Sequence, residues 1–488
     1  MTTRDGPSYH FAYYCSGHGF GHATRVAAIT AGLLSRGHRV SIVSSAPEKV
    51  FDSVLGRPPP TAQASYRFAV FEPVVDQPKA YVVDRTTTFN NLHAFLTLQR
   101  LAVIEHERQW LLDQHVHCVL IDAPFLPCAA ASQAKIPSVI VSNFTFDSCY
   151  SYLAAFGEDE DGGPRIDAER LDALVAITVA DYSKAELLLR LPGEIPIPGF
   201  DDDITLPATT WTDERTGYFR ADIDTKLQWP MRNERATRAK KVIDMPLVVR
   251  PLSGAACDPQ TKLTLLQDLG VPAELLNMET RILLVSFGGQ VIPSPRPPTS
   301  TDCGLDELPE TSETTHPAHS LLPPGWIAII CGLPPSSRPH ELPHNFFSIA
   351  NSKFNYVPDL TAVADVVMGK LGYGTCSEVI STRTPFISVP RKMFVEEYGL
   401  KRLMNKTGTV NVEMSIREFE EGRWCPYITL AHRLGQQQQQ PQPQDFSAQS
   451  GPAHLLKNGI DKSRRAVESV VDHLEVFLSR HKNVLQSP

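Results

Sequence analysis

The sequence predicts an α/β fold made of two doubly wound lobes that face a central cleft. Its 488 residues exceed a single hydrophobic core of usual size, so two or three domains are expected. A strand, a loop, a helix and a strand follow one another near the N-terminus, and the same order restarts near residue 280. Because parallel strands are joined by such crossovers, each half is expected to hold its own parallel sheet.

The first lobe is predicted to begin with a strand, a helix and a second strand. Segment 10–16 (HFAYYCS) is a short apolar strand, and segment 39–45 (RVSIVSS) is the next one. Between them, segment 23–38 places apolar residues at helical spacing and ends near Gly37. The unit is repeated by three segments: CVLIDAP (118–124), CAAASQAK (128–135) and PSVIVSNF (137–144).

The second lobe is predicted from a renewed series of apolar strands. Its segments are TRILLVSFGGQ (280–290), WIAIICG (326–332) and ADVVMGKLGYGTCSEVISTRTPFISVP (364–390). The last of these reads as a strand, a glycine turn, a helix and a strand. Both lobes are therefore expected to be Rossmann-like.

These elements predict four parts of the chain. The parts are 1–240 as the N-terminal Rossmann-like lobe, 241–434 as the C-terminal Rossmann-like lobe, 435–452 as a Gln/Pro-rich linker and 453–488 as a closing helix. Apolar residues at helical spacing indicate that helix: Ala466, Val470, Val471, Leu474, Phe477 and Leu478. Within the first part, 201–240 is expected to be an insertion or linker.

Four segments are expected to be disordered surface insertions. They are rich in Pro, Ser, Asp, Glu or Gln and lie at about 155–170, 201–240, 291–322 and 435–452. Their few apolar side chains bury too little surface to offset the entropy of ordering.

Composition narrows the classes of partner and compartment. The chain has 46 basic and 54 acidic residues, a net charge of -8, so no nucleic-acid partner is expected. Nine cysteines without a CxxC pair indicate reduced thiols. The N-terminus lacks an apolar signal core, and no run of about 18 apolar residues predicts a transmembrane segment. A cytoplasmic location is expected, and the oligomeric state is left open.

The loop CSGHGFGHATR (15–25) is the first candidate site. A glycine-rich turn between a strand and a helix presents backbone N–H groups at the positive end of a helix dipole, which suits phosphate or carboxylate. The loop residues singled out are Gly17, His18, Gly19, Gly21 and Arg25. His22 stands where the third glycine of a dinucleotide fingerprint is required, and the chain has no Walker loop. His18 and His22 lack a third ligand nearby, so no metal is expected.

His22 is the candidate general base. A neutral imidazole at the carboxyl edge of a sheet has a pKa near working pH and can take a proton from a hydroxyl. Asp122, at the end of the strand 118–122, is the candidate carboxylate that orients it. The alternative is that Asp122 caps the helix that begins near Leu126.

The second lobe supplies the candidate anion site. Gly372, Gly374 and Thr375 form a turn that opens a helix, with Lys370 before the turn and Glu378 one turn inside the helix. Such a helix start suits a diphosphate, and Glu378 suits ribose hydroxyls. Glu396 and Glu397, after the next strand, suit sugar hydroxyls, although a solvated acidic pair is the alternative.

The segment ADVVMGKLGYGTCSE resembles the donor-binding stretch HCGWNSxxE of two-lobed GT-B glycosyltransferases. The resemblance implies that Thr375 and Glu378 bind a nucleoside-diphosphate sugar, with Lys370 where many members have His. NYVPDL resembles their WxPQ element, which places Tyr356 and Val357 by the nucleobase. FGGQ resembles the glycine turn of their C-terminal lobe, formed here by Gly288, Gly289 and Gln290. The resemblance also implies that His22 and Asp122 stand at the catalytic histidine and its partner aspartate. It further implies that 1–240 is the acceptor-side lobe and 241–434 the nucleotide-sugar lobe.

A narrower resemblance is to the N-terminal glycosyltransferase-like half of plant-type L-arabinokinases. The matching motifs are GHGFGHATR, SNFTFD, RLPG, IDMPLVVR, FGGQ, LPPGW, GKLGYGT and CPY. The kinase half of those proteins, with its ATP loop, is expected to be absent. Glu396 and Glu397 replace the usual Asp-Gln, so the identity of the donor cannot be carried over.

The expected function is a glycosyltransferase, not a kinase. It would move a sugar from a nucleoside-diphosphate sugar, expected to be a UDP-sugar, to an unidentified hydroxyl acceptor, with inversion and with neither metal nor cofactor. The alternative is a non-catalytic module that binds sugar nucleotides.

Overall fold

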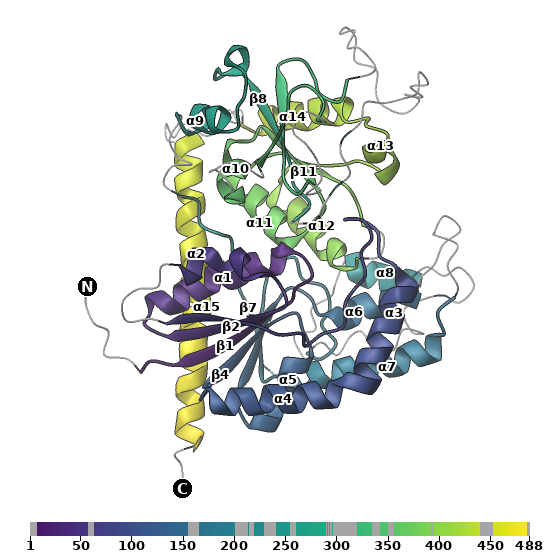
Figure 1. The fold of residues 1–488 in the computed structure, drawn as a ribbon, viewed down its shortest axis with the longest axis vertical. Coiled ribbons are helices and arrows are strands. Elements are labelled where there is room, and N and C mark those ends of the chain that lie inside the picture. Colours follow the sequence, from purple (N-terminus) through teal and green to yellow (C-terminus); the bar gives the residue numbers. More distant parts are fainter. Residues whose placement is uncertain are drawn as a thin grey trace.

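The computed structural model describes most of the chain in segments. These are residues 7–56, 63–154, 165–200, 213, 219–228, 241–253, 260–288, 290, 292, 295, 320–333, 342–349, 356–391, 394–439 and 452–485. Much of the predicted insertions and part of the Gln/Pro-rich linker lie outside these ranges. Figure 1 shows two α/β lobes, one above the other, with one long helix beside both.

The first lobe is built on seven parallel strands in the order β3-β2-β1-β4-β5-β6-β7. The strands are β1 (His10–Cys15), β2 (Arg39–Ser44), β3 (Ala64–Phe68), β4 (Cys118–Asp122), β5 (Ser138–Ser142), β6 (Leu187–Arg190) and β7 (Lys241–Asp244). The helices are α1 (Phe20–Ser35), α2 (Asp52–Leu55), α3 (Arg85–Ala94), α4 (Arg100–Asp113), α5 (Leu126–Ala134), α6 (Phe146–Ser151), α7 (Ala168–Tyr182) and α8 (Ala221–Gln228).

The second lobe is built on six parallel strands in the order β10-β9-β8-β11-β12-β13. The strands are β8 (Arg281–Val285), β9 (Trp326–Ile330), β10 (Phe346–Ser348), β11 (Val366–Gly369), β12 (Phe386–Ser388) and β13 (Asn411–Glu413). The helices are α9 (Gln260–Asp268), α10 (Val357–Val363), α11 (Tyr373–Thr382), α12 (Glu396–Thr407), α13 (Ile416–Glu420), α14 (Cys425–Gln439) and α15 (Pro452–Leu485).

The predicted fold class is confirmed, because each lobe holds its own parallel sheet with helices packed on it. The central strands β1, β4 and β5 are buried along their whole length, as expected for strands covered on both faces. In each sheet the strand order reverses once, between β1 and β4 and between β8 and β11. Open α/β sheets bind ligands at this point, outside the carboxyl ends of the strands.

The start of α1 differs from the prediction. The helix begins at Phe20 rather than near Ala23, so Gly21, His22 and Arg25 lie on its first turns and not in a loop. Gly19 takes the N-cap position with φ of 84°, a backbone conformation that favours glycine. The glycines that suggested a longer loop therefore form the entry to the helix.

Several segments extend or shift the predicted parts. Strand β7 pairs with β6 in the first sheet, although 241 was the expected first residue of the second lobe. Helix α8 lies within the predicted insertion 201–240, because Ile223 and Leu227 bury their side chains in the core. Helix α14 continues to Gln439, into the predicted linker, and α15 occupies the predicted closing helix.

Helix α15 runs beside both lobes (Figure 1). It packs on α1 and on α11. On the side of the first lobe, Asp472 accepts from Arg36 at 2.7 Å, and Glu475 lies 3.1 Å from His38. At its other end, the Ser463 hydroxyl donates to the carbonyl oxygen of Val249. Among the described residues, no helix combines the length and apolarity needed to span a bilayer.

Candidate active site

The two reversal points of the sheets face each other across the lobes. Cys15 at the end of β1 is in register with Asp122 at the end of β4, so the glycine loop starts beside this carboxylate. The starts of α1 and α11 also meet: a Cβ added to Gly374 would lie 3.5 Å from Gly21 Cα. Two positive helix ends therefore converge on one place.

A small cavity lies between these helix starts. Its volume is about 40 Å³, room for about three water molecules. The lining residues are His18, Gly19, Gly21, His22, Arg25, Gly288, Lys370, Gly372, Tyr373, Gly374, Thr375, Arg391, Phe394 and Glu396. Eleven of these were predicted as site residues from the sequence, and the fold brings them together from both lobes. A sugar nucleotide is far larger than this space, so admitting one would require the gap between the helix starts to widen.

His22 and Asp122 form the predicted pair. His22 Nδ1 lies 3.2 Å from Asp122 Oδ1. Among the described residues, the other ring nitrogen, Nε2, has no protein hydrogen-bond partner. Helix α5 has Phe125 at its N-cap and no side-chain cap, so the alternative role of Asp122 as a helix cap is wrong.

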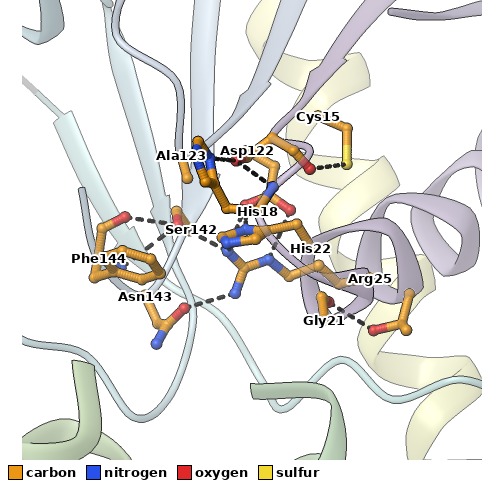
Figure 2. Close-up of polar contacts among 12 residues, drawn as sticks. Cys15, His18, Gly21, His22, Arg25, Asp122, Ala123, Ser142, Asn143 and Phe144 are labelled. Atoms are coloured by element: carbon orange, nitrogen blue, oxygen red, sulfur yellow. Dashed lines mark hydrogen bonds and ion pairs between the residues drawn. The ribbon is translucent and has the colours of Figure 1, made fainter. Parts of the chain in front are cut away.

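Arg25 is the centre of a buried network that the sequence did not reveal. Its guanidinium donates from Nε to Asp122 Oδ2 at 2.8 Å and from Nη1 to Asn143 Oδ1 at 2.6 Å (Figure 2). Its other face lies over the Tyr373 ring, 4.8 Å from the centroid. Burial opposes the charge of Arg25, but Asp122 outweighs burial and raises the pKa of the guanidinium. Burial likewise raises the pKa of Asp122, but Arg25 and His22 hold that pKa below its usual value.

His18 has both ring nitrogens engaged, which separates it from His22. The backbone N–H of Val75 donates to His18 Nε2 at 2.8 Å, so this nitrogen is an acceptor. His18 Nδ1 lies 3.0 Å from Ser16 Oγ and 3.4 Å from Glu72 Oε1. Glu72 also accepts from the backbone N–H of Gly17 at 3.0 Å. His18 therefore fixes the glycine loop and has no nitrogen left for proton transfer.

Lys370 is a buried cation on the cavity wall. Its Nζ lies 3.8 Å from the position of a Cβ on Gly19, so the two lobes approach each other closely at this point. No described residue is within hydrogen-bond or ion-pair distance of the ammonium. Burial, helped by the charge of Arg391, lowers the pKa of Lys370 to about 7.

Glu396 and Glu397 are buried, so their reading as a solvated acidic pair is wrong. Glu397 accepts from Arg391 Nε at 2.8 Å, yet burial outweighs this bond and raises the pKa of Glu397. Glu396 Oε1 accepts from Asn143 Nδ2 at 3.2 Å, across the boundary between the lobes. Asn143 thus connects the Arg25 network to the second lobe.

The predicted nucleoside residues form a separate group. Glu378 accepts from Arg250 Nη2 at 2.6 Å, and the Arg250 guanidinium lies over the Tyr356 ring, 5.5 Å from its centroid. Val357 starts α10 beside them. None of these residues lines the cavity.

The predicted glycine turn after β8 is only partly described. Gly288 lines the cavity with φ of 65°, and Gly289 lies outside the described residues. Gln290 hydrogen-bonds with Gln77 of the first lobe.

Sequence reasoning missed five residues of the site: Ser142, whose hydroxyl accepts from Arg25 Nη2 at 3.1 Å, Asn143, Tyr373, Arg391 and Phe394. Asn143 and Arg391 each follow the last residue of a parallel strand within three positions, in SNF after β5 and in VPR after β12. Asp122 was chosen because ligands bind outside the carboxyl ends of parallel strands, and the same reasoning would have found Asn143 and Arg391. In the described ranges, no group of three or more His, Cys, Asp and Glu residues is placed to hold a metal ion.

Comparison with known proteins supports the resemblance seen in the motifs. No family model matches the chain. L-arabinokinase of Arabidopsis thaliana is 32% identical over 425 residues, which are 87% of this chain. This chain is similar to L-arabinokinase. It spans about a third of that relative, since the match covers 32% of the relative's length.

Three solved structures with a similar backbone are glycosyltransferases. The calicheamicin glycosyltransferase CalG4 gives a TM-score of 0.49 at 14% identity, covering 97% of this chain and 99% of its own. A UDP-glucosyltransferase from Polygonum tinctorium gives 0.48 at 15%, with coverages of 96% and 99%. Phytolacca americana UGT2 gives 0.46 at 13%, with coverages of 97% and 100%.

Proposed function

We propose that this chain is a glycosyltransferase that moves a sugar from a nucleoside-diphosphate sugar to a hydroxyl acceptor. One observation carries the proposal: His22 has Nδ1 on Asp122 and, within the described part of the chain, no partner at Nε2, and it faces the glycine turn and Lys370 across one cavity. A base on one wall and an anion site on the other are the two functions that such a transfer needs.

In the proposed reaction, His22 acts as the general base. With its proton on Nδ1, donated to Asp122, the imidazole presents a lone pair at Nε2 to the acceptor hydroxyl. The acceptor oxygen bonds to the anomeric carbon as the bond from that carbon to the diphosphate breaks, and the hydroxyl proton passes to Nε2. Attack from the face opposite the leaving group inverts the anomeric configuration.

The leaving diphosphate is proposed to lie at the start of α11. There the backbone N–H groups after Gly372, the Thr375 hydroxyl and the Lys370 ammonium supply positive charge. The dipole of α1 points at the same place from the other lobe. In this proposal, these protein groups stabilise the negative charge that develops on the leaving diphosphate. A UDP-sugar is the first donor to test.

The test is donor turnover by the full chain and by His22→Ala. With UDP-glucose, the wild type is expected to release UDP, and His22→Ala is expected to lower this rate about 100- to 10,000-fold, the usual value of a positioned base. His106→Ala, on the exposed side of α4, is the matched control. Equal rates for the wild type and His22→Ala refute the assigned base.

A second candidate function is a sugar-nucleotide sensor without turnover. One contact favours it: Arg25 Nη2 lies 3.2 Å from His22 Nδ1. If the guanidinium donates to this nitrogen, the imidazole proton sits on Nε2, and His22 offers the cavity a donor rather than a base.

Nitrogen-15 NMR of His22 separates the two candidates, because it shows which ring nitrogen carries the proton. A proton on Nδ1 supports the transferase. A proton on Nε2, together with calorimetric binding of UDP- or GDP-sugars and no release of nucleotide, supports the sensor.

A further inference from the structure

Four buried polar atoms near the glycine loop of the first lobe have no hydrogen-bond partner among the residues that the structure describes. They are Glu72 Oε2, Thr145 Oγ1, Asp147 Oδ2 and Tyr150 Oη. All four residues are at most 4% exposed. Buried polar groups are nearly always paired, so a cluster of unpaired ones marks a place where a water or a ligand supplies the missing bonds.

This cluster adjoins the candidate base. The Phe146 ring lies 5.2 Å from the His18 ring and 6.0 Å from the His22 ring, between centroids. Tyr150 stacks on Phe146 at 6.0 Å, one turn along α6. Glu72 joins this cluster through His18, since Glu72 Oε1 lies 3.4 Å from His18 Nδ1. Burial first, and the Glu72 carboxylate next, raise the pKa of the Tyr150 phenol well above its usual value.

The chemistry of the cluster selects the kind of ligand. Glu72 Oε2 can only accept, whereas the Tyr150 hydroxyl can donate and accept, so a ligand hydroxyl can donate to the first and accept from the second. The carboxylates of Glu72 and Asp147 repel an acid or a phosphate. The Phe146 ring is 1% exposed and packs against the His22 and Tyr150 rings, so it forms an apolar wall beside the candidate base and the Tyr150 side chain.

We propose that Glu72 and Tyr150 form an acceptor subsite for a neutral polyhydroxylated ring, such as a free sugar or a cyclitol. The inference rests on the proposed function, and it adds the class of acceptor. With one hydroxyl at His22 Nε2, a second hydroxyl of the ring reaches between Glu72 and Tyr150, beside Phe146. The subsite thus sets specificity and leaves donor binding to the second lobe.

The test uses Tyr150→Phe and Glu72→Gln in the full chain, with transfer from UDP-glucose to myo-inositol, D-xylose and D-glucose as the readout. Tyr150→Phe removes one hydrogen-bonding atom, and Glu72→Gln replaces an accepting oxygen by a donating amide nitrogen; both keep the shape of the side chain. We expect KM for the preferred polyol to rise about tenfold or more in each variant. Hydrolysis of UDP-glucose should stay within twofold in Tyr150→Phe, which serves as the decisive variant because Glu72 also holds the glycine loop through Gly17. Transfer to 4-methylumbelliferone, which has a single hydroxyl, should change no more than donor hydrolysis does.

Tyr427→Phe is the matched control, because it removes a tyrosine hydroxyl from α14 of the second lobe, outside the residues that line the cavity. Equal KM for the polyol in the wild type and Tyr150→Phe overturns the subsite. So does a parallel loss of polyol and 4-methylumbelliferone transfer.

Failure of the proposed function is detected separately. If the wild type turns over no donor, saturation-transfer NMR with the same three polyols still tests the subsite. A signal that Tyr150→Phe abolishes and Tyr427→Phe keeps supports it. Absence of any polyol signal in the wild type, or an unchanged signal in Tyr150→Phe, overturns it.

Discussion

Lys370 shows most clearly how burial prepares a single residue for a ligand. Its ammonium lies in the closed gap between the lobes, where desolvation disfavours charge and lowers its pKa from 10.5 to about 7. In the unfolded chain the same group stays protonated up to its ordinary pKa. The destabilisation it causes is therefore fully present below pH 7 and is lost as the pH rises from about 7 to about 10.5.

A diphosphate at this position should restore the charge of Lys370. We predict that UDP binding at pH 8 takes up close to one proton per chain, because the free lysine is mostly neutral there and the bound one is charged. The affinity for UDP should then fall by up to about tenfold per pH unit above pH 7. Calorimetry in buffers of different ionisation enthalpy measures the proton uptake directly.

Lys370→Met should bind UDP more weakly and without proton uptake. Lys406→Met, which removes an exposed lysine from the last turn of α12, is the control and should behave as the wild type. Proton uptake that persists in Lys370→Met would show that another group titrates.

At the scale of elements, the sequence predicted the strands and helices that carry strong local patterns. Strands with a continuous apolar run, such as β1, β4 and β8, are visible in the sequence because strands covered on both faces need apolar side chains. β7 was assigned to the other lobe, since its pairing with β6 depends on contacts between segments 50 residues apart. The early start of α1 was missed because Gly19 and Gly21 read locally as a loop.

The packing of α15 on α1 depends on one glycine. Gly32 lies inside α1, and a Cβ added there would come within 2.4 Å of Val467 Cγ1 and 3.2 Å of Val471 Cγ2. On a free helix surface, Gly to Ala stabilises by up to about 1 kcal/mol. Here we predict the opposite sign: Gly32→Ala should lower the free energy of unfolding by about 1–3 kcal/mol, because the two helices must move apart.

Chemical denaturation of Gly32→Ala, Val467→Ala and the double variant measures this contact. The double variant should lose less stability than the sum of the two single variants, since Val467→Ala makes room for the new methyl group. Strict additivity of the three values would mean that the helices do not press on each other at Gly32.

At the scale of the molecule, the site exists only because two lobes meet. Local sequence selected His22, Asp122, Lys370 and Thr375 separately, from their places after strands and before helices. It did not show that Asn143 joins Arg25 to Glu396 across the boundary, because this contact spans 253 positions of the chain. It also gave no sign that Glu378 is paired with Arg250, since the orientation of segment 247–253 is set by packing between the lobes.

Part of the contact between the lobes is made by residues 69–84, the segment between β3 and α3, here called the arm. After β3 the chain reaches the second lobe, where Tyr81 packs on Phe287 and Phe419 and is 3% exposed. Glu420 accepts from Lys79 Nζ at 2.6 Å and from the Tyr81 hydroxyl at 2.7 Å. The root of the arm is fixed to the glycine loop through His18. Opening of the cavity must therefore break the contacts of the arm tip or move the loop.

Weakening the arm tip should make the site easier to enter. We predict that Glu420→Ala raises the association rate of UDP about twofold to tenfold, because it removes one half-exposed ion pair and one hydrogen bond that favour the closed state. The apparent affinity should rise with it, since a larger fraction of the protein is open to the ligand. Stopped-flow binding of a fluorescent UDP analogue measures both.

The neighbouring Glu421 offers a control of the same size and charge. Its carboxylate pairs with Arg417 at 2.7 Å and with Arg423 at 2.9 Å, all within the second lobe. Glu421→Ala should therefore leave the association rate as it is in the wild type. If both variants speed binding equally, the cause is the lost negative charge near an anionic ligand. If neither does, the arm tip does not limit opening, and the lobes separate by moving the arm as part of the second lobe.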